Sequence, residues 1–565
     1  MPQHELVVHG GKIITLDASS RIAQALAVRD GRIAAVGDAA MVMKDKGPGT
    51  KVLDVSGKTL TPGFYDAHPH MDRHGLKHRG GIALDGCDSI SRIQDVIRQA
   101  AARTPKGEWI VLMPMGTPPT DYVYRPEQLA EGRFPTRQEL DAAASEHPVY
   151  IRACWGWWSH RPFPSVANTK ALELAGVTRD SVAPYNCQIL KDAKGEPSGV
   201  FLDRNYAPLM EYTLFRCVPR FTYEDRVAGV RLGSAAYSAT GTTAAYEGHG
   251  ITPPLIEAYR QVHAAGELTV RMQIPLSLPT AAFDNRKIAE LLYHWANVLA
   301  GRGSGDGMLR LEGVCVDVGD AQTAAVIGQH YPYEQWAGHF YQSLPHERFV
   351  EIGVLAAKLG LRLNCLVCYD LERVLRAYEA VHAQVPIDEK RWVIIHVIET
   401  TPGQLERIKR LGLVATVTPN FMYMASDRFG LDKLRGRGVP IRELLDAGIP
   451  MALSSDNVPH SMLFTMWQAL SRWDNDSRSK LGESRLGREE ALRIATCTGH
   501  YLAWEEGSRG PLVPGNAADF VVLAEDPLTC AEDRIKDIPV ERTFVDGREV
   551  FTPPKWGQAQ EGPSF

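Results

Sequence analysis

The sequence predicts an α/β protein in which repeated βα units close a parallel barrel and both chain ends build one small β-sandwich. Three observations support this fold class. Apolar strand-like runs alternate with amphipathic stretches through the middle of the chain. Short strands separated by Gly-Gly and Asp-Gly turns fill residues 5–55. The same strand pattern, again with an Asp-Gly turn, returns in residues 515–551.

The predicted division follows this pattern. Residues 1–60 form the N-terminal part of the β-sandwich, residues 61–505 the barrel, and residues 506–565 the C-terminal part of the sandwich. A segment of about residues 100–220 interrupts the barrel. It is irregular, rich in Pro, Trp and Tyr, and longer than a usual βα connection, so we expect either an inserted lid or a subdomain that shapes the substrate pocket.

Composition narrows the class of partner. The chain has 565 residues, 44% hydrophobic and 23% charged, which is the balance of a soluble globular protein with a large core. A formal net charge of -5 disfavours nucleic acid and anionic membrane surfaces, so we expect a small-molecule substrate. No apolar run is long enough to cross a membrane, and the first residues lack the layout of a secretory signal. Nine scattered cysteines are typical of reduced thiols in a cytoplasm. The sequence leaves a homo-oligomer open.

Eight apolar runs are candidates for the barrel strands. In a parallel barrel the carboxyl ends of the strands meet at one face, where the following loops build a site. Polar residues stand at these ends here. The candidate runs are residues 61–68, 240–250, 268–276, 309–319, 361–370, 391–399, 413–420 and 449–457.

The first candidate strand ends in two histidines, His68 and His70. Residues i and i+2 of a strand point to the same side, so both imidazoles can bind one cation, and Asp66 lies near enough to orient a ring nitrogen. Alone, such a pair is a weak sign of a metal site, because polar pairs at this spacing are common.

Four motifs taken together resemble the metal-dependent amidohydrolase superfamily: PGFYDAHPH after the N-terminal strands, RWVIIHVIE, MALSSDN and GNAADFVVL. Finer features, among them NTKALELAGV and REEALRIATCTGHYLA, resemble the branch that contains N-substituted formamide deformylases. The resemblance covers nearly the whole chain. It implies a distorted (β/α)8, TIM-like barrel flanked by a β-sandwich from both termini.

The resemblance also implies a set of metal ligands: His68, His70, His396 after the sixth strand and Asp456 after the eighth. Neutral imidazoles and one carboxylate leave an open position on zinc, where the pKa of a bound water drops to roughly 7. Asp456 would take the water proton and return it to the leaving group, and His396 would ligate the ion or polarise the carbonyl. The alternatives are a core histidine and an aspartate that caps a helix.

Two positions depart from the pattern of the relatives. A lysine that becomes carbamylated and bridges two metals is replaced by Cys315, and the fifth-strand histidine corresponds to Asn364, whose amide is a weak ligand. We therefore expect one zinc ion per chain and no second metal. Cys315 either binds this ion as a thiolate or fills a buried space.

Five residues are candidates for substrate contacts. Glu247 and His249 follow the third strand and would act as a proton relay or a substitute ligand, or only hydrogen-bond locally. Asn364 would face the same pocket. In the insertion, His160 matches a histidine of the relatives, and Trp157 offers a flat apolar wall for an aromatic ligand or packs the lid onto the barrel.

The predicted function is hydrolysis of an amide-type C–N bond, in an N-acyl, N-formyl or cyclic amide of an aromatic or hydrophobic small molecule. Two alternatives remain open at this point. One is metal-dependent C–C bond hydrolysis or decarboxylation on the same fold, because a metal also stabilises an enolate. The other is a non-catalytic binding protein with a decayed site.

Overall fold

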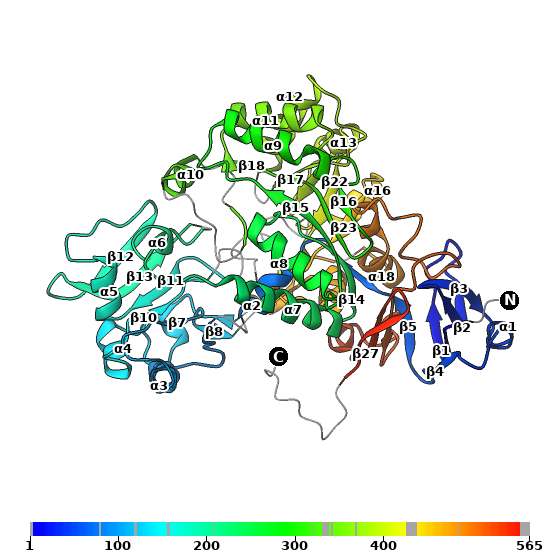
Figure 1. The fold of residues 1–565 in the computed structure, drawn as a ribbon, viewed down its shortest axis with the longest axis horizontal. Helices are drawn as coiled ribbons and strands as arrows, with labels where there is room; N and C mark the ends of the chain where they lie inside the picture. The colour runs from blue at the N-terminus through cyan, green and yellow to red at the C-terminus, as the bar shows by residue number, and fades with distance from the viewer. Residues whose placement is uncertain are drawn as a thin grey trace.

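The computed structural model describes residues 4–77, 81–117, 121–154, 159–205, 207–319, 321–329, 338–340, 343–367, 370–424, 438–483 and 485–553. Within this part of the chain, three sheets organise the molecule: a barrel sheet, a terminal sheet built by both chain ends, and an insertion sheet. Figure 1 shows the barrel between the other two, with the blue and red strands of the terminal sheet side by side.

Eight parallel strands form the barrel sheet in the order β6-β14-β15-β17-β20-β21-β22-β23. Seven of them fall inside a predicted run and β15 extends one residue beyond its run, so the eight predicted strands are confirmed. Ala67 N donates to Leu453 O at 3.0 Å, which joins the end of the last strand to the first and nearly closes the barrel. The strands are β6 (Phe64–Asp66), β14 (Thr242–Tyr246), β15 (Arg271–Ser277), β17 (Leu309–Cys315), β20 (Leu363–Leu366), β21 (Val393–Ile395), β22 (Val414–Val417) and β23 (Met451–Leu453).

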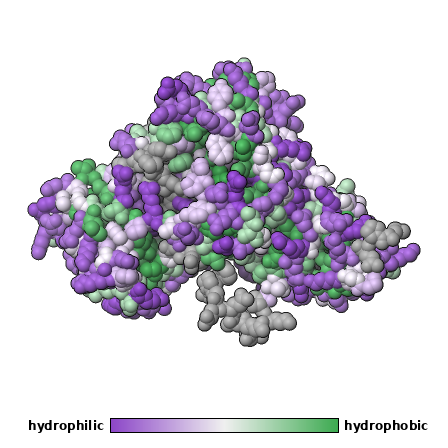
Figure 2. Space-filling model, viewed as in Figure 1, coloured by the Kyte–Doolittle hydropathy of each residue, from purple (hydrophilic) through white to green (hydrophobic). Residues whose placement is uncertain are grey.

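Helices connect these strands and cover them on the outside. Several begin at a capping residue that the sequence supplies: Thr222 and Asp225 exchange capping hydrogen bonds at α7, as Thr401 and Gln404 do at α13. On the face shown in Figure 2, hydrophilic residues cover much of the molecule, because the helices turn their apolar sides inward. The helices are α2 (Met71–Lys77), α7 (Tyr223–Ala239), α8 (Pro253–Ala264), α9 (Asn285–Leu299), α11 (His346–Lys358), α12 (Leu371–His382), α13 (Pro402–Arg410), α16 (Ile441–Asp446), α17 (Met462–Ser471) and α18 (Arg488–Thr496).

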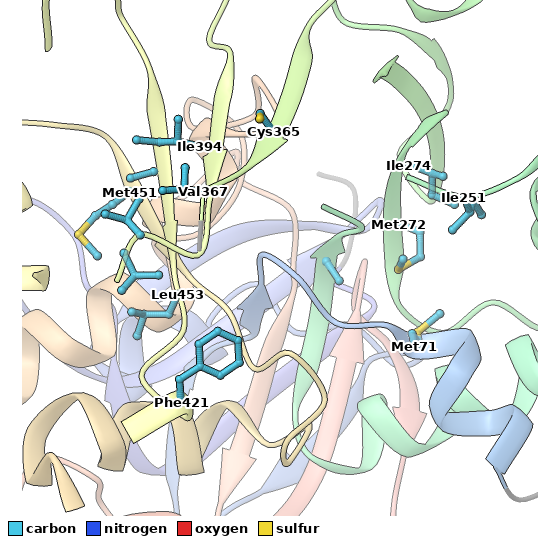
Figure 3. Packing of buried hydrophobic residues seen from close by; sticks show 14 of the residues in the cluster. Met71, Ile251, Met272, Ile274, Cys365, Val367, Ile394, Phe421, Met451 and Leu453 are labelled. Atoms are coloured by element: carbon cyan, nitrogen blue, oxygen red, sulfur yellow. The ribbon is translucent and has the colours of Figure 1, made fainter. Parts of the chain in front are cut away.

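Two layers of apolar side chains follow the alternation along the barrel strands. Ile394 belongs to the large cluster between the strands and the helices, which Figure 3 shows with Met272 and Ile274 of β15. Its neighbours Val393 and Ile395 belong to a different, smaller cluster on the other side of the strands. This is the pattern of a packed barrel, with one set of side chains inside and the other under the helices.

The helix that follows the predicted histidine pair is held by close backbone packing. A Cβ added to Gly75 of α2 would lie 1.9 Å from the carbonyl oxygen of Gly229 in α7, so the two helices touch backbone to backbone. The Tyr237 hydroxyl of α7 donates to the carbonyl oxygen of Pro69, between the two histidines. Helix α7 therefore fixes the segment that carries both imidazoles.

The terminal sheet contains strands from both ends of the chain, as predicted. β5 pairs with β1 on one side and with β26 on the other. Apolar residues from both ends, including Leu6 and Phe520, share one cluster. The ladder forms one sheet, and the two-layer sandwich and the boundaries at residues 60 and 505 stay predictions. Its strands are β1 (Leu6–Ile14), β2 (Ile22–Arg29), β3 (Arg32–Gly37), β4 (Lys51–Asp54), β5 (Thr59–Pro62), β26 (Phe520–Leu523), β27 (Val540–Val545) and β28 (Arg548–Phe551).

The insertion is a folded unit with its own sheet, where the sequence suggested irregular structure. Its strand order is β12-β13-β11-β10-β7, and helix α3 packs into the same apolar cluster through Ile93 and Ile97. Its role as a lid stays a prediction. The elements are α3 (Ile90–Ala101), β7 (Ile110–Leu112), α4 (Arg137–Ala143), β10 (Val149–Ile151), β11 (Phe163–Ala167), α5 (Thr169–Ala175), β12 (Cys187–Lys191), β13 (Pro197–Asp203) and α6 (Leu209–Tyr212).

Short elements complete the described chain. They are α1 (Ala39–Met43), β8 (Gly116–Thr117), β9 (Asp121–Tyr122), β16 (Ser304–Gly305), β18 (Asp317–Val318), α10 (Ala321–Gly328), β19 (Ser343–Leu344), α14 (Phe421–Met424), β24 (Trp473–Asp474) and β25 (Ser479–Lys480), with 3-10 turns at Pro126–Gln128, Thr498–Tyr501 and Glu532–Asp537. Over the described residues, no helix combines the length and the apolar character that a bilayer crossing needs.

Candidate metal centre at the carboxyl ends of the barrel strands

The four predicted metal ligands come together at one end of the barrel. His68 and His70 follow β6, His396 follows β21, and Asp456 follows β23. All four side chains are buried. The ring centroid of His68 lies 4.3 Å from that of His70 and 4.4 Å from that of His396. The predicted convergence of imidazoles and carboxylate is therefore present in the structure.

Two overlapping groups of side chains offer their ligand atoms within 4.8 Å of one another. One group is His68, His396 and Asp456, and the other is His68, His70 and His249. The two are linked further, because His70 Nε2 lies 2.9 Å from Asp456 Oδ1. His68 belongs to both groups, so they form one site rather than two separate ones.

Three of these residues have a left-handed backbone. The φ angles are 51° at His70, 60° at His396 and 52° at Asp456. Residues other than glycine adopt this conformation at a cost of about 1–3 kcal/mol, and such residues cluster at functional sites. The chain turns sharply as each strand ends, and this turn aims the side chain at the common centre.

Burial sets the protonation state of the imidazoles. Desolvation lowers the pKa of His68, His70 and His249 well below the ordinary histidine value, and lowers the pKa of His396 to about 3. These rings are therefore neutral at pH 7. Neutral imidazole is the form that binds a metal ion.

Hydroxyl groups determine which nitrogen of His396 faces the centre. Ser454 Oγ donates to the carbonyl oxygen of Val417 at 3.2 Å, so Thr418 Oγ1, 2.6 Å from Ser454 Oγ, donates to Ser454. Thr418 then accepts the proton of His396 Nδ1, 2.6 Å away. The lone pair of the ring is left on Nε2, which has no hydrogen-bond partner among the described residues.

The ring of His68 also lacks hydrogen bonds to the described residues. Neither of its ring nitrogens has a hydrogen bond to a described residue, although the side chain is fully buried. A buried imidazole without a hydrogen bond is costly unless something else binds it. Nitrogen ligands with one carboxylate oxygen are a set that zinc accepts. The residues present therefore fit a divalent ion of this kind.

Asp66 has a different role from the one the sequence suggested. We expected its carboxylate to orient a ring nitrogen of the histidine pair. Instead, Asp66 Oδ1 accepts from the backbone N–H groups of His68 and Ser455, both at 3.0 Å, and Asp66 Oδ2 accepts from the Ser455 hydroxyl at 2.5 Å. It ties the ends of the first and eighth strands together, which brings Asp456 next to His68.

Glu247 takes the orienting role. Its Oε1 lies 3.0 Å from His70 Nδ1 and 3.9 Å from the Arg73 guanidinium. Burial raises the pKa of Glu247, and the Arg73 charge opposes this rise. A carboxylate on the second ring nitrogen is the usual way to fix the tautomer and plane of a metal-binding histidine.

Asn364 is held by two protein groups. Its Oδ1 accepts from the Tyr246 hydroxyl at 2.9 Å, and its Nδ2 donates to the carbonyl oxygen of Gly248 at 3.1 Å. The amide therefore fixes the loop after β14. The substrate contact that the sequence suggested for Asn364 stays a prediction.

The other predicted site residues either belong to neither of these two groups or lie outside the described residues. Cys315, at the end of β17, is fully buried and in neither group, and burial raises its thiol pKa, which disfavours the thiolate that a metal needs. Its role as a ligand stays a prediction. The His160 ring lies against Tyr124, and its Nε2 is 3.5 Å from Asp476 Oδ2. Trp157 lies outside the described residues.

Two buried residues beside the site, Arg73 and His339, were not predicted from the sequence. Arg73 Nη2 donates to His339 Nδ1 at 2.9 Å, and the His339 ring stacks on His249 with centroids 4.7 Å apart. Arg73 gave a usable signal, since it stands three residues after His70 in α2 and a buried arginine needs a partner. His339 gave none.

Comparison with known proteins agrees with this geometry. The model of the Amidohydrolase family matches residues 51–551. The chain belongs to the Amidohydrolase family. This amidohydrolase is 27% identical to the N-substituted formamide deformylase of Arthrobacter pascens, over 96% of its own length and 97% of that protein.

Two solved structures show the same fold. An uncharacterised metal-dependent hydrolase from Pyrococcus horikoshii OT3 is 20% identical, with a TM-score of 0.67 over 94% of this amidohydrolase and 99% of that chain. An adenosine deaminase from Xanthomonas campestris, solved with bound zinc, is 13% identical, with a TM-score of 0.54 over 97% of this chain and 93% of that one. The family membership and the His and Asp cluster together support a metal-dependent hydrolase.

Proposed function

We propose that this amidohydrolase is a zinc-dependent hydrolase that cleaves an amide-type C–N bond in a small aromatic or hydrophobic molecule. Its substrate would be an N-acyl, N-formyl or cyclic amide. The observation that carries the proposal is the convergence of His68, His396 and Asp456, all buried, at the carboxyl ends of three barrel strands. The likeness to a protein named N-substituted formamide deformylase supports the amide class.

The ion would be held by His68, His70, His396 and Asp456, one per chain. When bound, zinc supplies a Lewis acid that polarises a carbonyl and lowers the pKa of a water molecule. One ion is favoured because His68 is common to both ligand groups. The guanidinium of Arg73, 3.9 Å from Glu247, adds a positive charge that disfavours a second cation nearby.

Asp456 is the proposed proton carrier. Its carboxylate takes a proton from the attacking water as the oxygen bonds to the carbonyl carbon, and returns the proton to the nitrogen as the C–N bond breaks. The products are a carboxylic acid and an amine. His396 ligates the ion or polarises the carbonyl through Nε2, which the Thr418 hydroxyl holds in the productive tautomer.

Substrate contacts are proposed on the insertion side of the site. His160 and Trp157 belong to the segment that follows β10, and we propose that both bind an apolar acyl or amine group of the substrate. Glu247 and Asn364 instead make protein contacts that hold His70 and the loop after β14.

The test measures the amine released when N-substituted formamides and arylamides are incubated with zinc-loaded or with chelator-treated protein. Released amine, lost on chelation, supports the proposal. Released carbon dioxide or a shortened ketone would favour C–C cleavage instead. Protein that holds no zinc and turns over nothing would favour a binding protein.

A variant sharpens this test. Asp456→Asn keeps the shape of the side chain but removes the proton carrier and one charged ligand atom, so turnover should fall by at least about 100-fold. Asp388→Asn, at an exposed position, is the matched control and should behave like the unaltered protein. Full activity of Asp456→Asn would contradict the proposed role.

A further inference from the structure

His249 lies in the loop after β14, and its ring is close to the rings of His68 and His70. Its ring centroid is 4.8 Å from that of His68 and 5.3 Å from that of His70. Its ligand atom lies within 4.8 Å of those of both residues, and the side chain is buried. His249 is therefore within reach of an ion that His68 and His70 bind.

Two features fix the loop that carries His249: the hydrogen bonds of Asn364 and the absence of a side chain at Gly248. Asn364 donates to the carbonyl oxygen of Gly248, the residue before His249, and accepts from Tyr246. Gly248 itself has no side chain, and a Cβ there would lie 2.2 Å from His68 Nδ1. The backbone can approach the His68 ring this closely only because position 248 is glycine.

The His249 ring is also fixed from its outer side. His339 stacks on it, with an interplanar angle of 16°. Arg73 can only donate, so its hydrogen bond places the lone pair of His339 on Nδ1 and holds that ring in turn. Because Asn364 fixes its loop and His339 stacks on its ring, the His249 side chain loses little conformational entropy when it binds an ion.

We infer that His249 is a zinc ligand, supplied by the loop after the third barrel strand. The inference rests on the proposed function and adds one imidazole to its ligand set. Zinc at catalytic sites reaches five-coordination, so four imidazoles still leave one position open for water, and Asp456 beside the ion keeps its role as proton carrier. Asn364 is then a positioning residue, which holds the loop and does not touch the ion.

Zinc affinity measured by competition with a chelator tests the inference. His249→Gln should weaken binding by about 100-fold, because a ligand is lost. Asn364→Leu should weaken it by about 10-fold, the scale of a lost supporting contact. His263→Gln is the matched control, since His263 lies on α8 beside Asp306, at 3.0 Å, and should leave the affinity unchanged. Binding by His249→Gln as tight as in the unaltered protein would overturn the inference.

X-ray absorption at the zinc edge of the unaltered protein gives a second readout that does not depend on a variant folding. Four imidazole ligands are expected, from His68, His70, His249 and His396. Three would overturn the inference while leaving the proposed function standing. An unaltered protein that binds no zinc would instead overturn the proposed function itself.

Discussion

Thr418 Oγ1 lies 2.6 Å from His396 Nδ1, across the ends of the neighbouring strands β22 and β21. The contact is the first of a chain of hydrogen bonds that ends at a backbone carbonyl, so the tautomer of His396 is set by the fold and not by the ion. His396 is thereby prepared to bind through Nε2 before any ion arrives.

Removing this hydroxyl should loosen the site. Thr418→Val keeps the shape of the side chain but leaves His396 Nδ1 without its acceptor, and zinc affinity should fall by about 10- to 100-fold. Thr418→Ser keeps the hydroxyl and should bind zinc nearly as the unaltered protein does. Equal affinities of the valine and serine variants in chelator competition would show that the hydroxyl is dispensable.

Gly248→Ala should displace His68. The added Cβ would meet His68 Nδ1 at 2.2 Å, so either the ring or the loop must move, and we expect zinc affinity to fall by at least about 10-fold. The matched control is Gly403→Ala in α13, where an added Cβ meets nothing within 4 Å. That variant should keep its zinc and gain slightly in thermal stability, since alanine favours helix.

The buried pair Arg362 and Glu312 should behave as one unit. Their side chains are in contact, both are buried, and the guanidinium lies 5.7 Å from the ring centroid of Tyr246. Arg362→Met leaves the carboxylate buried without its partner and should lower the free energy of unfolding by about 3–5 kcal/mol. The double variant with Glu312→Gln should recover most of this loss in denaturant unfolding. A double variant as unstable as the single one would show that the arginine acts through packing alone.

His500 should make stability depend on pH. Burial lowers its pKa from 6.5 to about 3. Between these values the unfolded chain binds the proton and the folded chain does not, so the stabilising contribution is complete above pH 6.5 and is lost as the pH falls toward 3. From pH 7 to pH 5 this loss is about 2 kcal/mol.

The check on His500 is a comparison of slopes. His500→Phe keeps an aromatic ring against Tyr65, whose ring centroid lies 5.0 Å away, but cannot take a proton. Its unfolding free energy should fall less steeply between pH 7 and pH 5 than that of the unaltered protein. Parallel slopes would mean that His500 titrates alike in the folded and unfolded chain.

Local patterns predicted the barrel and much of its site. The apolar runs that alternate with amphipathic stretches placed all eight strands, and the two-residue spacing of His68 and His70 placed both imidazoles on one side of a strand end. The resemblance to known sequences added His396 and Asp456. The strands and the histidine pair can be predicted from residues within one segment, and His396 and Asp456 from a short motif around each of them.

The rest depends on contacts between segments far apart in the chain. Thr418 and His339 reach the site from other strands and loops, and no spacing marks them in advance. Asp66 was misjudged because its proximity to the histidines along the chain says nothing about Ser455, which the barrel closure brings to it. Asn364 was expected to be a poor ligand, but its place under the loop of Gly248 appears only in three dimensions.

The strand β5 leads directly into β6 and the histidine pair, and it lies between β1 and β26. Its partner β26 is made only after the ribosome has finished the whole barrel. A nascent chain therefore carries an incomplete sheet edge beside its first ligand strand through most of synthesis, and unpaired edges of this kind invite association with other chains. The segment that carries His68 and His70 therefore gains its full sheet support only after residues 520–523 have been made.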